Sequence, residues 1–520
     1  MPLQRKTARF GEKNGSSFVR GAAVLSAAVL AVKAIGAAYR IPLTRTIGAE
    51  EMGVYAAGFS VYMLIGTLAG AGIPNVAAQL CAARLRCGDE AGALSVFAVS
   101  KRLLLVFGAA GAMSTVLFAR PIAACLGMPQ AAPAIRAMSP GILADAWIAA
   151  YRARLQGMQR MGGVAVSQIV QQIVRAASGL LFAHLFLSYG EGMGAAGAML
   201  GMTVSEFAAI ASLHASAGRT KGAYESQTAQ SLLRLSLPLM LGGCIAPLCS
   251  MAESMMLVPR MAAFGVSAQQ ALADYGVLTA MTGTIVALPL MLIGALGMSL
   301  MPDIAAAKNR MQRCRRVRQG MAAALVLAVG AGVCLALFSD DLIGLLYHTA
   351  PLSQRILAGR LLRLQAASIV PHCVSIIAAA SLQGFGKTKE SAICQGLCAA
   401  LKTGAAWFLL ARQGIEGVCI ASIFSAAVGC TAALGFLRRA CGERILRFPM
   451  LGYPLFGAAL FCAAAASLQR MFGYGTLSLA GAFALGAAVY LVACAPLLMQ
   501  KEAGEWERSP SSGSGTTRAR

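Results

Sequence analysis

Two cations spaced seven residues apart lie inside the first apolar segment of the chain. Lys33 and Arg40 interrupt a run that begins near Phe18. Seven residues is close to two helical turns, so both side chains fall on one face of a helix. A charge inside a bilayer costs about 3 kcal/mol on insertion scales, so it usually faces a polar cavity or a partner. The pair predicts a site for an anion, although Arg40 has a second interpretation, in which it only reaches the outer interface.

Arg45 is a third candidate substrate-binding cation. Three prolines and one glycine are candidates for positions at which helices break or bend. Pro42 lacks an N–H group and is expected to end the first helix. Pro74 and Pro302 are expected to break or bend their own helices. Gly36 is expected to allow bending or close packing of the first helix.

Composition defines the class of protein that carries these residues. Of 520 residues, 58% are hydrophobic and 12% are charged, whereas soluble proteins have about 25% charged residues. Apolar runs of about 20 residues recur along the chain, which is typical of membrane-spanning helices. We predict an all-α polytopic membrane protein with fourteen spans, near 18–41, 52–73, 101–119, 137–157, 163–187, 194–215, 232–256, 275–299, 320–338, 361–382, 390–411, 415–437, 451–469 and 476–499.

Basic residues gather on one side of these spans. That side holds 31 of the 44 lysines and arginines, the other side holds 10, and Lys33, Arg175 and Lys402 lie inside spans. Cytoplasmic loops carry such an excess, so both termini are expected in the cytoplasm. An uncleaved first span fits better than a cleaved signal peptide, because equally apolar segments follow at once. The net charge of +24 does not indicate nucleic-acid binding, since the cations are spread over short loops.

The two halves of the chain resemble each other. Gly157 and Gly384 end matching Leu-Gln-Gly triplets, Pro74 and Pro302 lie in matching segments, and the two pairs have nearly the same separation along the chain. Six spans return the chain to its starting side, so the two copies are parallel, as in several transporters. The predicted organisation is a basic cytoplasmic N-terminus (1–17), an N-lobe (18–215), a cytoplasmic linker (216–231), a C-lobe (232–437), an extra helix pair (451–499) and a disordered cytoplasmic tail (500–520).

No motif indicates an enzyme. The 15 cysteines are scattered through the spans without a C-x-x-C pair, and the four histidines lack metal-binding spacing. A nucleotide-binding loop and a nucleophile elbow are also absent from the sequence. We therefore expect no catalytic residues, no metal site and no cofactor.

Several motifs resemble those of a known family. They are Tyr39-Arg40-Ile-Pro42-Leu-Thr-Arg45-Thr-Ile-Gly48, Glu51-Met-Gly53-Val-Tyr55, Gly70-Ala-Gly72-Ile-Pro74, Leu155-Gln-Gly157-Met-Gln159 and Leu382-Gln-Gly384-Phe-Gly386-Lys387. Over nearly all of residues 15–500 the chain resembles the multidrug/oligosaccharidyl-lipid/polysaccharide exporter superfamily, in the branch of polysaccharide biosynthesis proteins, stage V sporulation protein B and bacterial lipid II flippases.

This resemblance implies a fold and a function. Family members have two six-helix lobes around a central cavity lined by spans one, two, seven and eight. They export undecaprenyl-pyrophosphate-linked sugars or lipid II by alternating access. The resemblance therefore implies a flippase for a cell-wall precursor in the bacterial cytoplasmic membrane, with that lipid-linked substrate and membrane lipids as partners. We expect a monomer that binds no nucleic acid.

Acidic residues are candidates for gating or ion coupling, with sodium or a proton as the coupling ion. Relatives often carry an acidic residue late in span seven, where this chain has Glu253. Aligning Pro42 with Pro259 makes Glu253 correspond to Gly36, and we expect it across the cavity from the first-span cations. The alternative is that Glu253 forms a fixed structural ion pair or is a protonated glutamic acid. Asp145 and Asp274 are the other candidates. Span eight carries no arginine, unlike that of Gram-negative lipid II flippases.

The remaining embedded charges have two interpretations. Arg175, Glu206, His372 and Lys402, like Asp145, either line the cavity or form structural pairs between helices. For Arg175 and Glu206 a structural pair is favoured.

Two other functions remain open. One is a cation-coupled multidrug antiporter of the same fold, although a cationic first span disfavours binding of drug cations. The other is a scaffold of a cell-wall synthesis complex that transports nothing.

The charge distribution makes a direct prediction about topology. A cysteine introduced within residues 308–318, the most basic loop, should react with impermeant reagents only from the cytoplasmic side. Labelling of intact cells from outside would reverse the assigned orientation.

Overall fold

The computed structural model describes residues 3–70, 72–217, 225–443, 445–446, 448–472 and 476–499. Part of the predicted linker and the whole predicted disordered tail lie outside these residues, as do the side chains of the basic N-terminus. In the described part, 11 helical segments are long and apolar enough to cross a membrane. Each of the fourteen predicted spans falls on a helix, and the segment Ala27–Arg86 alone contains two of them.

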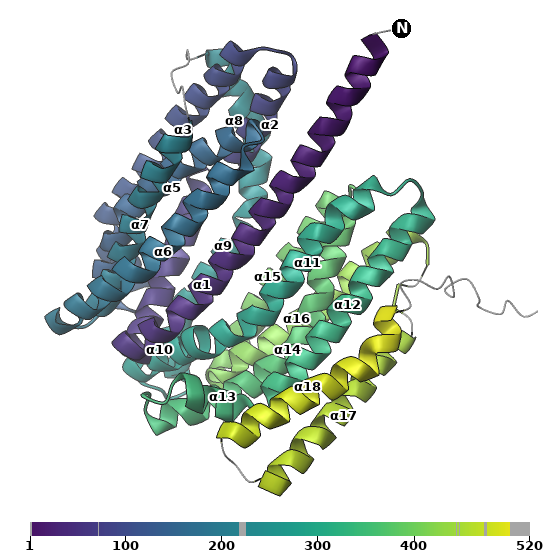
Figure 1. Ribbon diagram of the computed structural model, residues 1–520. Helices are drawn as coiled ribbons and strands as arrows, with labels where there is room; N and C mark the ends of the chain where they lie inside the picture. The colour runs from purple at the N-terminus through teal and green to yellow at the C-terminus, as the bar shows by residue number, and fades with distance from the viewer. Residues whose placement is uncertain are drawn as a thin grey trace, which may run out of the picture.

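The helices form two bundles, which we call the N-lobe and the C-lobe (Figure 1). The N-lobe contains α1 (Leu3–Leu68), α2 (Ile73–Arg86), α3 (Glu90–Leu117), α4 (Ala119–Cys125), η1 (Pro129–Ala131), α5 (Ala132–Gly157), α6 (Met161–Phe186), η2 (Leu187–Tyr189) and α7 (Met193–Ala217). The helix α8 (Ser226–Gly243) lies beside α2 and α3 of the N-lobe. The C-lobe contains α9 (Ile245–Ala263), α10 (Ala268–Gly276), η3 (Val277–Thr282), α11 (Gly283–Ala306), α12 (Arg310–Leu337), α13 (Ser339–Leu346), α14 (Leu352–Gly384), α15 (Thr388–Gln413) and α16 (Glu416–Cys441).

An additional helix pair lies against the C-lobe. The helices α17 (Phe448–Phe472) and α18 (Thr476–Met499), yellow in Figure 1, pack beside α12. The hydroxyl of Tyr490 donates a hydrogen bond to the Val326 carbonyl at 2.7 Å, which fixes α18 to α12.

The break in α1 differs from the prediction. Pro42 does not end the helix, which continues to Gly48, where φ is 80° and ψ is 172°. Proline removes one N–H donor, but the helix persists around it, and the Thr46 hydroxyl donates to the Pro42 carbonyl at 2.9 Å. Gly48 has no Cβ and adopts the left-handed region without a steric penalty. It therefore separates the first two spans.

Pro74 and Pro302 occupy different positions in their helices. Pro302 lies inside α11, which continues to Ala306, whereas Pro74 stands in the first turn of α2, where a missing N–H costs nothing. The helix α2 packs against α3 and α5 and buries Val76 and Cys81.

The internal repeat is visible in helix lengths and in close contacts. The helices α3 and α12 both have 28 residues, and α6 and α15 both have 26. A Cβ on Gly197 would collide with the Phe182 carbonyl, and one on Gly417 would collide with the Leu409 carbonyl. These two contacts occupy equivalent places in the two lobes. Small residues allow close helix approach, which matters in lipid because burial from water does not drive helices together there.

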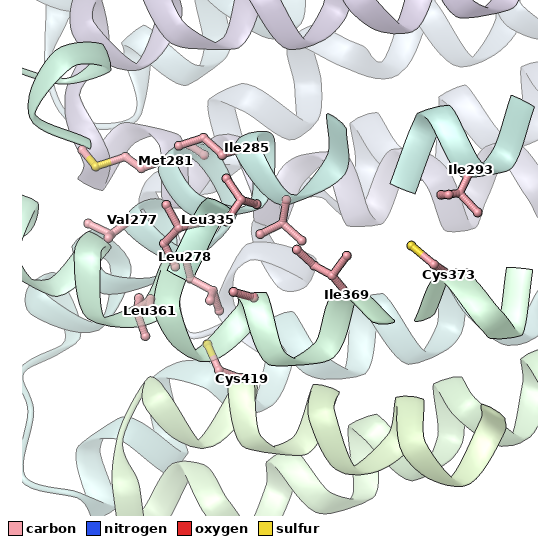
Figure 2. Close-up of a cluster of buried hydrophobic side chains, with 14 of the residues drawn as sticks. Val277, Leu278, Met281, Ile285, Ile293, Leu335, Leu361, Ile369, Cys373 and Cys419 are labelled. Atoms are coloured by element: carbon pink, nitrogen blue, oxygen red, sulfur yellow. The ribbon is translucent and has the colours of Figure 1, made fainter. Parts of the chain in front are cut away.

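The C-lobe core shows how this packing is achieved. In Figure 2 the side chains of Val277, Leu278 and Met281 on η3 lie among residues of α12 and α14, including Leu335 and Leu361. All five are buried. Dispersion contacts between such closely packed side chains hold the lobe together.

The lobes meet at what we call the closed end, formed by residues 45–53, 269–276 and 345–346. A Cβ on Gly276 would collide with the Ala49 carbonyl, and one on Gly53 would collide with the Leu272 carbonyl. The amide of Gln269 also donates to a Glu50 carboxylate oxygen at 3.2 Å. Glycine on both sides therefore permits backbone contact between the lobes at this end.

Span seven connects the two lobes. Its first half, α8, packs against α2 and α3 of the N-lobe, and its second half, α9, packs against α15 of the C-lobe. The guanidinium of Arg260 on α9 donates to the Trp407 carbonyl at 2.8 Å and lies over its ring, 4.1 Å from the centroid. The change of partner occurs at Cys244, where the helix is interrupted.

The close contact at Gly276 makes a prediction about the closed end. Gly276→Ala adds a methyl group where the Ala49 carbonyl lies, so the lobes must separate there. Amide hydrogens of α10 should exchange about tenfold faster or more, because each 1.4 kcal/mol of lost local stability raises exchange by that factor. Hydrogen-exchange mass spectrometry measures this effect.

Gly294→Ala on α11 is the matched control, because a Cβ there would meet no atom within 4 Å. Equal exchange of α10 in the two variants would show that the glycine contact does not hold the closed end.

Candidate functional site

Lys33 and Arg40 lie on the wall of a cavity of about 350 Å³ between α1, α6 and α11. The cavity is therefore bounded by both lobes. Gln172 and Arg175 of α6 and Thr284 of α11 complete its polar lining. Lys33 is exposed and Arg40 is half-buried.

Arg175 is a third cation on the same wall. Its Nη2 donates to the Tyr55 hydroxyl at 2.9 Å, and its guanidinium lies 5.7 Å from the centroid of the Phe59 ring. Its Nε is buried without a hydrogen-bond partner. Among the described residues Arg175 makes no ion pair, so the three cations of the cavity leave its wall positively charged.

The α11 wall contributes no charge. The hydroxyl of Thr284 donates to the Ala280 carbonyl at 2.7 Å, and those of Thr279 and Thr282 bond to carbonyls one turn earlier in the same way. The π-helical turn η3 precedes this wall, and such turns often occur at functional sites. The charge of the cavity therefore comes from the N-lobe alone.

Arg45 is not part of the cavity, contrary to the sequence prediction. Its Nε donates to the Leu346 carbonyl at 2.7 Å and its Nη2 to the Leu345 carbonyl at 3.3 Å. These are free carbonyls at the end of α13, which attract a cation. Nearby, the Tyr347 hydroxyl donates to the Ala280 carbonyl, and burial raises its pKa to about 12. Arg45 therefore joins the lobes at the closed end.

Glu253 also differs from its predicted position. It does not face the first-span cations, because its Oε2 accepts a hydrogen bond from Lys402 Nζ at 2.8 Å and its Oε1 accepts one from the Thr403 hydroxyl at 3.1 Å. Both partners belong to α15 of the same lobe. The bilayer cost of two separate charges explains the pairing, and a lysine inside span eleven was the signal for it in the sequence.

Polar contacts beside Glu253 reach the N-lobe. The hydroxyls of Ser254 and Ser60 lie 3.0 Å apart, and those of Ser254 and Tyr275 lie 3.1 Å apart. Ser60 belongs to the second half of α1, so α9 is joined to both lobes at this depth.

Asp145 and Glu206 lie within the N-lobe. Asp145 lines a second cavity of about 190 Å³, together with Tyr62 and Leu104. Glu206 is buried and accepts a hydrogen bond from Gln171 Nε2 at 2.7 Å, while Gln171 Oε1 accepts one from Arg152 at 2.6 Å. The favoured direct pair of Glu206 with Arg175 is therefore not formed, because an amide takes the place of the cation.

The other residues predicted to belong to the site either lie away from the cavity or, like Gly36, lie on its wall within a helix. Asp274 is buried on α10 near the closed end and accepts a hydrogen bond from Gln270 at 2.7 Å. His372 bonds through Nδ1 to the Ser368 carbonyl of its own helix at 3.0 Å. Gly36 lies on the cavity wall in a helical part of α1, where a Cβ would come within 3.0 Å of Gln172 Nε2, so the glycine allows close packing.

Sequence reasoning missed the role of Glu51. Its carboxylate accepts hydrogen bonds from the backbone N–H groups of Gly192, at 2.5 Å, and Ala195, at 2.8 Å, at the start of α7. Burial raises the pKa of Glu51, and the two backbone hydrogen bonds oppose that rise. A carboxylate stabilises a helix N-terminus. The Glu51-Met-Gly53 motif therefore joins the turn after span one to span six.

The Glu253–Lys402 pair can be measured by a double-mutant cycle. The side chains of Glu253 and Lys402 are 17% and 33% exposed, so the coupling between Glu253→Gln and Lys402→Gln in the free energy of unfolding should be about 1–3 kcal/mol. Reversible unfolding in mixed detergent provides the readout.

The exposed pair of Asp303 and Arg316, at 3.2 Å, is the control, and its coupling should be below about 1 kcal/mol. Additive effects of the Glu253 and Lys402 substitutions would contradict an ion pair that holds α9 to α15.

Comparisons with known proteins identify families and relatives that resemble this chain. The family described as "Polysaccharide biosynthesis protein" matches residues 18–308, and the family described as "MatE" matches residues 238–408. Stage V sporulation protein B of Bacillus subtilis (strain 168) is 25% identical over 506 residues, which cover 92% of this chain and 94% of that protein. Lipid II flippase MurJ of the same organism is 23% identical over 409 residues, covering 73% and 74%.

Solved structures show the same fold. The structure of lipid II flippase MurJ in an inward closed conformation has a TM-score of 0.72 at 12% identity, covering 92% of this chain and 99% of that one. The inward-facing conformation of a multidrug resistance MATE family transporter of the MOP superfamily has a TM-score of 0.68 at 15% identity, covering 79% and 94%. The predicted all-α polytopic fold is confirmed. Since the first family match covers more than half of the sequence, this multi-pass membrane protein belongs to the polysaccharide biosynthesis protein family.

Proposed function

We propose that this protein translocates an undecaprenyl-pyrophosphate-linked cell-wall precursor, either lipid II-like or a polysaccharide repeat unit, across the bacterial cytoplasmic membrane. The observation that carries the proposal is the cavity between the lobes. Lys33, Arg40 and Arg175 line it, and among the described residues no carboxylate does. The name of one relative, lipid II flippase MurJ, supports a lipid-linked substrate, and the family description supports a role in polysaccharide synthesis.

The physical task explains why such a cavity is needed. The headgroup must cross about 30 Å of hydrocarbon, which cannot solvate its charges. Arginine forms paired, charge-assisted hydrogen bonds to phosphate oxygens, and lysine adds a compact charge. The prenyl tail stays in lipid, since it gains nothing by entering a polar cavity.

Alternating access requires two arrangements of the lobes. In the arrangement seen here, Gly53 and Gly276 allow backbone contact at the closed end. With both termini in the cytoplasm, the closed end faces outward and the state is inward-facing. Span seven, whose halves pack on different lobes, is the element that must bend during exchange.

Four acidic or basic residues take supporting roles in this proposal. Asp145 is a candidate for coupling to sodium or a proton, because it lines an N-lobe cavity separate from the substrate cavity. Asp274 and Arg45 act in gating at the closed end, and Glu253 acts by holding α9 to the C-lobe.

The alternatives explain the cavity less well. A multidrug antiporter for organic cations needs negative charge where this cavity carries three positive side chains. A scaffold without transport needs neither the charged cavity nor the glycine contacts between lobes. We further propose that the protein works as a monomer, with both lobes of one chain enclosing the substrate.

Removal of a cavity cation should reduce transport. Arg40→Gln and Lys33→Gln should each lower the rate about tenfold, because one charged hydrogen bond is worth about 1.5–3 kcal/mol, while Lys33→Arg should retain most of it. The assay is translocation of a fluorescent lipid-linked pyrophosphate in proteoliposomes, followed by a quencher added outside.

Arg136→Gln, at an exposed position of α5 outside the cavity lining, is the control and should leave the rate unchanged. Transport at the normal rate in the double variant Lys33→Gln/Arg40→Gln would refute a role for this wall in binding the headgroup.

A further inference from the structure

The two lobes carry equivalent cations on equivalent helices. The helix α6 spans 161–186 and α15 spans 388–413, so both ends of the two helices are related by one and the same sequence offset. This offset makes Lys402 the counterpart of Arg175 in the repeat. Both cations lie inside the apolar part of their helices. Lys402 bonds to Glu253 on the first span of its lobe, whereas Arg175 bonds to Tyr55 on the second span and faces the first span across the cavity.

The partners of the two cations are not equivalent. In the C-lobe, Glu253 of α9 neutralises Lys402. Alignment of Pro42 with Pro259 makes Gly36 of α1 the counterpart of Glu253. The N-lobe therefore has a cation at the equivalent place, but a residue without a side chain where the carboxylate would stand.

The cavity occupies the place of the missing carboxylate. Gly36 and Arg175 both line it, and a Cβ on Gly36 would lie 3.0 Å from Gln172 Nε2, so this face of α1 is directed at α6. Two buried polar atoms on this wall, Arg175 Nε and the Tyr39 hydroxyl, lack hydrogen-bond partners within the described chain. Buried polar groups in folded proteins usually have partners, so these two point to a ligand.

Glu206 does not supply the missing charge. It lies close enough to attract Arg175 electrostatically, but the described hydrogen bond of its carboxylate is to Gln171. The Nε of Arg175 therefore remains available to an anion in the cavity.

We propose that a phosphate group of the substrate pairs with Arg175. In the N-lobe it would take the place that the Glu253 carboxylate takes beside Lys402 in the C-lobe. Arg175 is then a headgroup-binding residue, with Gln172 beside it and Lys33 on the same wall. This inference rests on the proposed function for the identity of the anion, and on the repeat for the site itself. Because the C-lobe is neutralised internally, the bound anion stays with the N-lobe when the lobes move.

Restoring the missing carboxylate tests the proposal. Gly36→Glu places a carboxylate beside Arg175, and Gly36→Gln places a side chain of the same size without the charge. The probes are geranylgeranyl pyrophosphate, geranylgeraniol and inorganic pyrophosphate, with binding measured on the full-length protein in nanodiscs. Gly36→Glu should weaken binding of the pyrophosphate probes at least tenfold, and Gly36→Gln less than threefold. Arg175→Gln should weaken it at least tenfold, and Arg175→Lys should retain part of the affinity.

Protein stability provides a second readout that does not need a ligand. Gly36→Glu should melt at a higher temperature than Gly36→Gln, because only the glutamate neutralises Arg175, and adding Arg175→Gln should abolish that difference. Equal binding and equal melting of the two Gly36 variants would overturn the inference, as would unchanged binding in Arg175→Gln.

The outcomes also separate this inference from the proposed function. If wild-type protein prefers geranylgeranyl pyrophosphate over geranylgeraniol and the two Gly36 variants behave alike, the inference fails and the proposed function stands. In another outcome, wild-type protein binds inorganic pyrophosphate, Gly36→Glu loses this binding and Gly36→Gln keeps it, but wild-type protein shows no preference between the two prenyl probes. The anion site then stands, and the proposal of a lipid-linked substrate fails. If no pyrophosphate probe binds, the anion site is refuted.

Discussion

The cost of placing an unneutralised charge within a bilayer governs this structure. Hydrocarbon solvates no ion, so each embedded charge must pair, reach water or face a ligand. The C-lobe pairs Lys402 with Glu253, and the N-lobe satisfies Glu206 through Gln171. The cavity wall instead keeps three cations that make no ion pair with a carboxylate in the described part of the chain. The fold tolerates this positive charge because water or a ligand can enter there.

Close packing supplies the stability that this arrangement requires. Helices in lipid gain little from apolar burial, so contact area and small residues decide which faces meet. Gly197 and Gly417 bring neighbouring helices into backbone contact at equivalent places of the two lobes, and Gly53 and Gly276 do the same between the lobes. The first two contacts lie within rigid bundles. The other two join surfaces that must separate in the proposed alternating access. Close contacts at glycine therefore serve both permanent packing and a reversible closure.

Hydropathy predicted the helices, because it depends on composition over whole segments, and matching motifs at a nearly constant separation predicted the repeat. The spacing of Lys33 and Arg40 predicted a shared face, and the cavity contains both. The partners of Arg45 and Glu253 could not be predicted, since they depend on which distant helices pack together. Pro42 was wrongly expected to end α1, because a proline breaks a helix only where nothing compensates for the missing donor.

The repeat carries more information than either lobe alone. Two copies of one six-helix unit start with the same architecture, so a difference between equivalent positions marks where their roles diverge. Glu253 and Gly36 are such a difference: the embedded Lys402 of the C-lobe has a carboxylate partner, and the embedded Arg175 of the N-lobe has none among the described residues. A transporter that moves an anion between two lobes benefits from an unneutralised embedded cation in only one of them, because a substrate held equally by both would resist their separation. The ligand can shift the balance of conformations only through such unequal contacts. Under the proposed function, the asymmetry between the copies is thus what allows a symmetric fold to transport in steps.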